Sequence, residues 1–145
     1  MLPFAAASLL AVSAAHAAAP PRDLGLVVEP VSDNAAACGV STAQVRDIAA
    51  AVLTERGWKL QDGAPDYLYV NVSIIHQATS SSCVFNIADA IGRRLLTGYG
   101  GHVVAFTART GELGIAPVAT AKRTITDKLH GLLQQLIATA EQDNL

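Results

Sequence analysis

The sequence is poor in charge and has no marked excess of either sign. Only 15% of its 145 residues are Asp, Glu, Lys or Arg, the formal net charge is -2 and the pI is about 6.0. A protein that binds nucleic acid usually needs a basic face, and a polybasic membrane anchor needs a cluster of Lys and Arg. The composition argues against both, and we expect no nucleic-acid partner.

Motifs for catalysis and for cofactor binding are also lacking. The sequence contains no G-x-S-x-G nucleophile elbow, no glycine-rich loop ending in G-K-[ST] and no H-x-x-x-H spacing. We therefore predict no catalytic residue, no metal site and no cofactor. The alternative is that His76 and His102, which fall at the ends of predicted strands, meet near Asp66 or Asp89 and hold a metal or carry out hydrolysis.

An uncharged stretch rich in Ala and Leu opens the sequence. Residues 1–19 carry no charged side chain and include an A-x-A cleavage site at Ala15-His16-Ala17. This predicts a signal peptide over residues 1–17, with cleavage after Ala19 as the alternative, followed by a single domain over residues 18–145. The run is too short and too Ala-rich for a stable transmembrane helix. A second reading is an apolar helix that stays in the protein.

Two cysteines, Cys38 and Cys83, remain in the chain after the predicted cleavage. In an exported protein their simplest state is a disulfide, and closing the loop between them is worth about 4 kcal/mol in the chain-entropy model. Their spacing is not the C-x-x-C of a redox pair. Two separate buried thiols are the alternative. No cysteine stands directly after the cleavage site, so we predict a periplasmic protein without a lipid anchor.

The clearest predicted strand covers residues 66–76, where side chains alternate with period two. One predicted face is apolar and consists of Leu68, Val70, Val72 and Ile74, and the other consists of Tyr67, Tyr69, Asn71 and Ser73. If the apolar face packs on helices, the tyrosine face is left for solvent or for a partner. The alternative is ordinary pairing with long side chains of neighbouring strands.

Two amphipathic helices are predicted, one on each side of the strand-rich middle of the chain. The first begins with a capping box at Ser41-Thr42-Ala43-Gln44 and ends at Gly57. The second begins near Thr124 or Thr126, and Gly131 within its apolar stripe suggests close packing on the sheet. Each helix carries one apolar stripe at helical spacing, as a helix that covers one face of a sheet requires.

The remaining segments complete an α+β domain. Strands are predicted at 24–31, 83–91, 102–109 and 113–122, with a short extended piece at 58–60, a hairpin turn at Thr110-Gly111-Glu112, and a mobile loop over Gly92–Gly101. The prediction is a mainly antiparallel, four- to five-stranded sheet with both helices on one face, in the order β-α-β-β-β-β-α. The glycine-rich loop adds three candidate partner-binding residues, Arg93, Arg94 and Tyr99.

This plan resembles the small periplasmic domains related to the TolB amino-terminal domain, which the curli-secretion protein CsgG and the lipoprotein activators of penicillin-binding proteins share. The residues that carry the resemblance are Val27-Val28-Glu29-Pro30, Asp66 to Val72 and Thr110-Gly111-Glu112. The resemblance implies a binding or assembly module without catalytic residues. This sequence departs from the many members that are lipoproteins, because it lacks their lipid-bearing cysteine.

These observations predict a non-catalytic, exported binding or adaptor domain of the bacterial cell envelope, whose partner is another envelope protein. The predicted contact residues are Tyr67, Tyr69, Asn71, Arg93, Arg94 and Tyr99. The alternative is a small envelope hydrolase, or a carrier of a metal or small molecule, that uses the two histidines and a nearby aspartate.

Overall fold

A five-stranded sheet and two α-helices make up the part of the chain that the computed structural model describes, residues 22–143. The predicted signal peptide lies outside these residues. The strands are β1 (Asp23–Val28), β2 (Lys59–Leu60), β3 (Asp66–Gln77), β4 (Ser82–Leu96) and β5 (His102–Pro117). The helices are α1 (Thr42–Glu55) and α2 (Val118–Gln142), and two 3-10 turns are η1 (Asp33–Cys38) and η2 (Ala78–Ser80).

The strand order in the sheet is β2-β1-β3-β4-β5. β1 runs parallel to both β2 and β3, while β3, β4 and β5 are antiparallel neighbours. Parallel neighbours need a long crossover connection, and α1 provides it between β1 and the strands that follow. The predicted α+β class with a mainly antiparallel sheet is confirmed.

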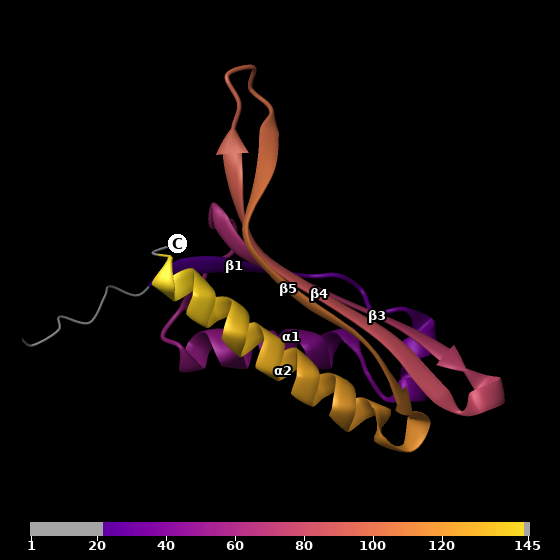
Figure 1. Cartoon of the computed structure of the whole chain (residues 1–145). Coiled ribbons are helices and arrows are strands. Elements are labelled where there is room, and N and C mark those ends of the chain that lie inside the picture. The colour runs from indigo at the N-terminus through magenta and orange to yellow at the C-terminus, as the bar shows by residue number, and fades with distance from the viewer. Residues whose placement is uncertain (1–21, 144–145) are drawn as a thin grey trace, which may run out of the picture.

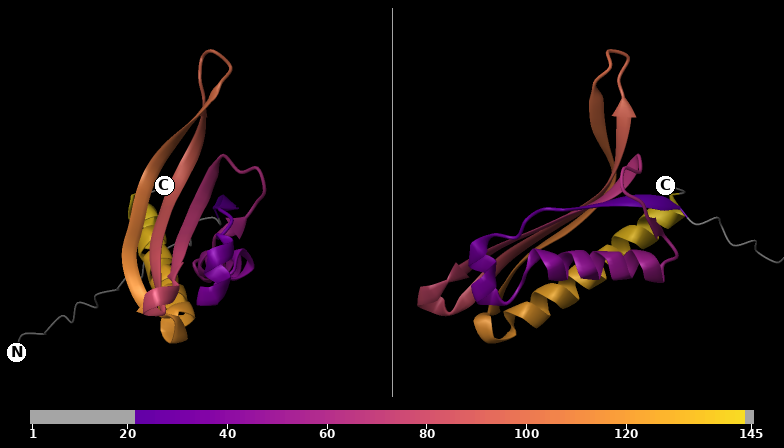
Figure 2. Two further views of the ribbon diagram at one scale, coloured as in Figure 1. Left: turned by 90° about the vertical axis from the view of Figure 1, so that its right-hand side faces the viewer. Right: turned by 180° about the vertical axis from the view of Figure 1, so that it is seen from behind.

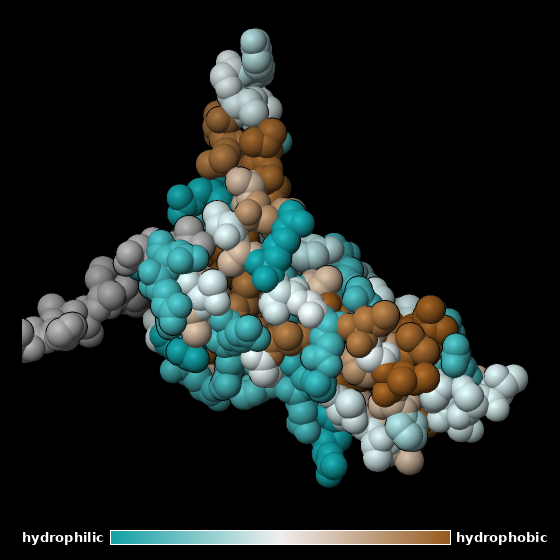
Figure 3. All heavy atoms as spheres, viewed as in Figure 1, coloured by the Kyte–Doolittle hydropathy of each residue, from teal (hydrophilic) through white to brown (hydrophobic). Residues whose placement is uncertain are grey.

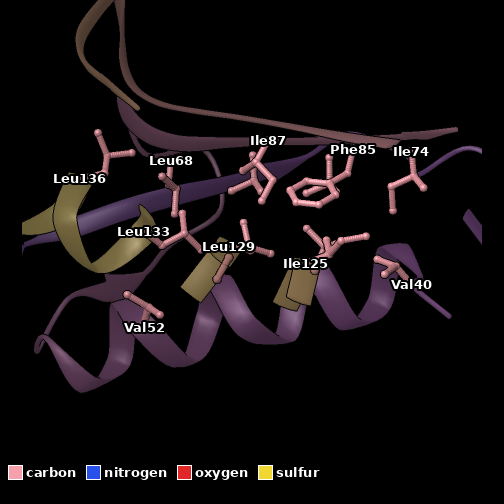
Figure 4. Packing of buried hydrophobic residues seen from close by; sticks show 14 of the residues in the cluster. Val40, Val52, Leu68, Ile74, Phe85, Ile87, Ile125, Leu129, Leu133 and Leu136 are labelled. Carbon is pink, nitrogen blue, oxygen red and sulfur yellow. The ribbon is translucent and has the colours of Figure 1, made fainter. Parts of the chain in front are cut away.

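Both helices lie on the same face of the sheet, and the core fills the space between the two layers (Figures 1 and 2). The apolar face of β3 points into this core, as predicted. Its residues Leu68, Val70, Val72 and Ile74 are at most 3% exposed. Side chains of α2, among them Ile125, Leu129 and Leu133, point toward the sheet from below (Figure 4).

Helix α1 begins as predicted. The Ser41 hydroxyl accepts a hydrogen bond from the Gln44 amide at 3.3 Å, and the Ser41 amide donates to Gln44 Oε1 at 3.0 Å. This reciprocal pair satisfies two backbone donors that the first turn would otherwise leave without partners. Gly57, at φ 77°, takes the left-handed conformation that ends the helix.

The predicted disulfide between Cys38 and Cys83 is confirmed. Both cysteines are buried, and the bond ties the end of η1 to the start of β4. It therefore links the helical layer to the sheet at one end of the molecule. Within residues 22–143, no helix combines the length and the apolar character needed to cross a membrane.

The predicted hairpin at Thr110-Gly111-Glu112 is wrong, because β5 runs unbroken from His102 to Pro117. The glycines serve close packing within the strand instead of a turn. A Cβ on Gly114 would lie 2.3 Å from the ring of Phe85, and a Cβ on Gly111 would lie 2.7 Å from the carbonyl oxygen of Ile87. Helix α2 starts directly after Pro117, six residues before the earlier of its two predicted starts.

The predicted loop at Gly92–Gly101 is also wrong in its first half, because β4 continues to Leu96. Only Thr97 to Gly101 form a turn, which three hydrogen bonds between these two residues close. The outer part of this hairpin, residues 93–104, projects from the body of the molecule as a two-stranded ribbon (Figure 1). We call these residues the arm.

Candidate functional site

The face of the sheet opposite α1 and α2, here called the outer face, has no helix of residues 22–143 over it (Figure 2). Side chains alternate between the two faces of a strand, so the second row of β3 points outward. The register aligns Tyr69 of β3 with Ala90 of β4 and Ala90 with Arg109 of β5, which places these three residues in one outward row. The antiparallel part of the sheet thus presents one face to its surroundings.

A hollow of about 200 Å³ lies on this face. Tyr69, Phe106 and Arg109 surround it, and Ala88 and Ala90 are also among its lining residues. The rings of Tyr69 and Phe106 meet edge to face with centroids 6.4 Å apart, and the Arg109 guanidinium lies 4.4 Å from the Phe106 ring centroid. We call this site the outer-face hollow. Its large walls enclose small alanine side chains, which leaves room for one group of a ligand.

An irregularity in the ladder brings Phe106 and Arg109 to the same face. Residues an odd number apart point to opposite faces of a regular strand. The pairing of β4 with β5 shifts between Ile91 and Gly92, so that Thr107 is an extra residue in β5. Such a bulge resets the alternation and re-aims the side chains after it. The Thr107 hydroxyl donates to the Ile91 carbonyl at 3.2 Å and holds the irregular segment in place.

Tyr67 faces outward as predicted, but the expectation that it is exposed is wrong. It is only 8% exposed, because its ring lies over Gly92, where an added Cβ would be 2.9 Å from the ring. The guanidinium of Arg94 covers the ring at 5.5 Å from its centroid. Tyr69 and Asn71 are half-buried, and the side-chain Oδ1 of Asn71 accepts a hydrogen bond from the hydroxyl of Ser73 at 2.9 Å.

The other predicted contact residues belong to the arm. Arg93 donates to both carboxylate oxygens of Asp66, at 2.5 and 2.8 Å, and this pairing raises the pKa of Arg93 further above its ordinary value. The pair joins the base of the arm to the start of β3. Tyr99 stands fully exposed at the tip, well beyond the outer-face hollow. The structure therefore groups Tyr69 with residues that the sequence did not indicate, and leaves Tyr99 apart.

The histidine constellation considered from the sequence does not form. His76 pairs with Cys83 at one end of β4, and His102 pairs with Leu96 at the other. At about 3.3 Å per residue, these positions lie roughly 40 Å apart along the strand. Asp66 is bound to an arginine near the His102 end, and no group of three or more metal-ligating side chains converges within residues 22–143.

Asp89 is a buried carboxylate on the inward face of β4. It is 2% exposed, and its partners in the register are Val70 and Thr110. Neither carboxylate oxygen has a hydrogen-bond partner within the described residues. Burial raises the pKa of Asp89 to about 7. The nearby backbone of Asn71 acts in the opposite direction and lowers the pKa, although its position does not meet the geometry of a hydrogen bond.

Sequence reasoning missed Phe106 and Arg109 as site residues. Both lie in a predicted strand, but their odd spacing places them on opposite faces unless a bulge is known. Tyr69 was found because strict alternation assigns it to the face opposite the core. Ala88 and Ala90 could not be identified from the sequence, since a small side chain leaves space for a ligand only where larger side chains surround it.

Comparisons with known proteins find only solved structures of low similarity. No family model matches the chain, and no curated protein matches it. Among solved structures, a PelC dodecamer from Paraburkholderia phytofirmans is 11% identical, with 81% of this chain and 86% of that chain covered and a TM-score of 0.42. A point variant of the PelC dodecamer from the same organism is 14% identical, covers 81% and 88%, and has a TM-score of 0.43. The resemblance to TolB-type domains stays a prediction.

Proposed function

We propose that this chain is a non-catalytic, exported binding or adaptor domain of the bacterial cell envelope, and that the outer-face hollow captures another envelope protein. The observation that supports the proposal is a sheet face that no helix of residues 22–143 covers, with Tyr69, Phe106 and Arg109 around Ala88 and Ala90. Aromatic and arginine side chains are the residues most often found at the energetic centre of protein interfaces. Export is supported by the predicted signal peptide and by the disulfide.

The hollow favours a ligand group that is apolar and lies next to an acid. The two rings and the alanines supply an apolar wall and floor, while Arg109 offers a planar guanidinium for a carboxylate. A single aliphatic or aromatic side chain from a partner fits this volume. We therefore propose a partner segment in which an apolar residue is followed by Asp or Glu.

Site-specific photocrosslinking tests the proposal in the cell. A photoreactive phenylalanine analogue replaces Phe106 in the full, tagged chain, and the same analogue at Gln135, exposed on α2, is the matched control. We expect a defined adduct with an envelope protein from position 106 and none from position 135. Adding Tyr69→Ala or Arg109→Gln should lower the adduct yield at least tenfold, which corresponds to the loss of about 1.4 kcal/mol of binding.

One control and two possible outcomes decide how the crosslinking result is interpreted. The variants must fold like the parent protein, as judged by an unchanged urea midpoint and an intact disulfide. Identical adducts from positions 106 and 135 would mean that the outer face has no special role. An adduct that survives both Tyr69→Ala and Arg109→Gln would contradict the assignment of the outer-face hollow.

A further inference from the structure

The arm carries a band of apolar side chains on both of its faces. Leu96 is 76% exposed, and Leu95, Val103 and Val104 are each more than 40% exposed. The register pairs Leu95 with Val103 on one face and Arg94 with Val104 on the other. An isolated two-stranded ribbon is marginally stable in water. A band that is apolar on both sides therefore favours a state in which another surface covers the arm.

A second apolar surface lies at the opposite end of the same ladder. Ile75, Val84 and Ile115 form one outward row across β3, β4 and β5, and Leu113 lies in the next row. Ile75, Leu113 and Ile115 are 60%, 73% and 65% exposed. We call these four residues the distal patch. Figure 3 shows apolar areas at both ends of the molecule, with mostly hydrophilic surface between them.

The two ends also differ in charge. The arm has two arginines and no acidic residue, and one of them, Arg93, is paired with Asp66 at the base of the arm. The strand segments around the distal patch, residues 70–92 and 110–117, have no Lys or Arg, and Glu112 there is paired with Lys128 of α2. Glu29 and Asp33 come after β1 in the sequence. Their segment lies beside the distal half of β3, because the Ser32 hydroxyl donates a hydrogen bond to the Ile74 carbonyl. Lys122 belongs to the helical layer, since its side chain lies against Gly39.

One copy cannot use its arm to cover its own distal patch. Leu95 and Val84 lie in the same strand, roughly 36 Å apart at about 3.3 Å per residue. Both surfaces are apolar and both belong to one chain. Arg94 lies beside the apolar band of the arm, and the acids Glu29 and Asp33 lie along the distal half of β3. We propose that copies of this chain associate head to tail, with the arm of one copy seated on the distal patch of the next. Such a contact joins two different surfaces, so it extends or closes into a ring.

This contact does not involve the outer-face hollow, so it can be tested separately from the proposed function. Two double variants remove apolar surface while keeping residues that suit strands. The arm variant is Leu96→Ser with Val104→Thr, and the patch variant is Leu113→Ser with Ile115→Thr. Leu60→Ser in β2, where Leu60 is 45% exposed, is the matched control. Sedimentation velocity of the mature chain over a concentration series measures association.

The expected pattern has three parts. The parent protein and Leu60→Ser associate, while each double variant weakens association at least tenfold, about the loss of one buried leucine. An equal mixture of the two variants forms a one-to-one dimer, because the intact arm of one meets the intact patch of the other. Far-UV spectra and urea midpoints verify that both variants are folded.

Three results would overturn the inference. The first is a parent protein that stays monomeric up to the highest concentration measured. The second is a mixture of arm and patch variants that stays monomeric, which would assign any self-association to a symmetric contact. The third is an arm that binds vesicles of anionic lipid while the chain shows no self-association, which would make a membrane its occupant.

Discussion

Asp89 is a carboxylate placed among apolar neighbours. Burial without a hydrogen-bond partner disfavours its ionised form and raises its pKa from 3.8 to about 7. Between these two values the folded protein holds a proton that the unfolded chain has released. Stability must therefore fall as the pH rises from about 4 to about 7. Above that range the carboxylate is ionised in both states, and the loss stays constant.

Asp89→Asn should remove this pH dependence, because an amide of the same shape carries no charge to bury. A shift of about three pKa units corresponds to a loss on the order of 4 kcal/mol above pH 7. We expect the variant to be the more stable protein at pH 8, with a much smaller difference from the parent at pH 4.5. Urea unfolding of both proteins at pH 4.5, 6 and 8 measures the difference. A constant difference across the three values would show that Asp89 does not titrate in this way.

The burial of Asp89 can be predicted from the sequence, but the rise in its pKa cannot. In the alternation Cys83, Phe85, Ile87, Asp89, Ile91 the aspartate occupies an inward position. Whether the carboxylate has a hydrogen-bond partner depends on which residues pack above it, and that is a matter of tertiary structure.

The disulfide was predictable for a different reason, since an exported chain with two cysteines has one possible pairing.

Glycine was the least reliable guide to the elements. The sequence places Gly111 between a threonine and a glutamate, which is typical of a turn, yet Gly111 lies inside β5, as Gly114 does. Their small size is required by Phe85 and by the backbone of β4, which a local pattern does not record. Helical stripes and the capping box were predicted well because they depend only on residues within one element.

Gly131 illustrates the same point within α2. The sequence suggested that it marks close packing on the sheet, but Gly131 is exposed and a Cβ there would meet nothing within 4 Å. We expect Gly131→Ala to stabilise the protein by about 1 kcal/mol, since alanine restricts the unfolded chain and favours the helix. Denaturant unfolding at fixed pH measures this gain.

The control for Gly131→Ala is the same change at a crowded position. Gly114→Ala places a methyl group against the Phe85 ring, so we expect it to cost about 1–3 kcal/mol. If the two variants shift the unfolding midpoint in the same direction, the packing at one of these glycines differs from that described.

At the scale of the whole molecule, the layered plan was accessible from the sequence and the surfaces were not. Two apolar stripes and one alternating strand are enough to predict helices on one face of a sheet. The outer-face hollow depends on the bulge at Thr107, and the arm depends on β4 and β5 pairing far beyond the body. Both features arise from pairing between residues far apart in the sequence, which a short stretch of sequence does not predict.

The arm should be separable from the rest of the fold. Beyond Arg94, whose amide donates to the Pro65 carbonyl, the two strands of the arm pair only with each other. Replacing residues 95–103 with Asn-Gly joins the paired residues Arg94 and Val104 by a two-residue turn suited to a hairpin. We expect the free energy of unfolding to stay within about 1 kcal/mol of the parent value, because no core residue is removed.

The shortened chain also separates the two proposals. It keeps Tyr69, Phe106 and Arg109, so crosslinking from position 106 should persist, whereas head-to-tail association should be lost with the arm. Sedimentation velocity and photocrosslinking on this one variant measure the two effects independently. A folded, shortened protein that still associates would place the contact elsewhere on the surface. Loss of both effects in a folded protein would mean that the arm and the outer-face hollow form one continuous binding surface.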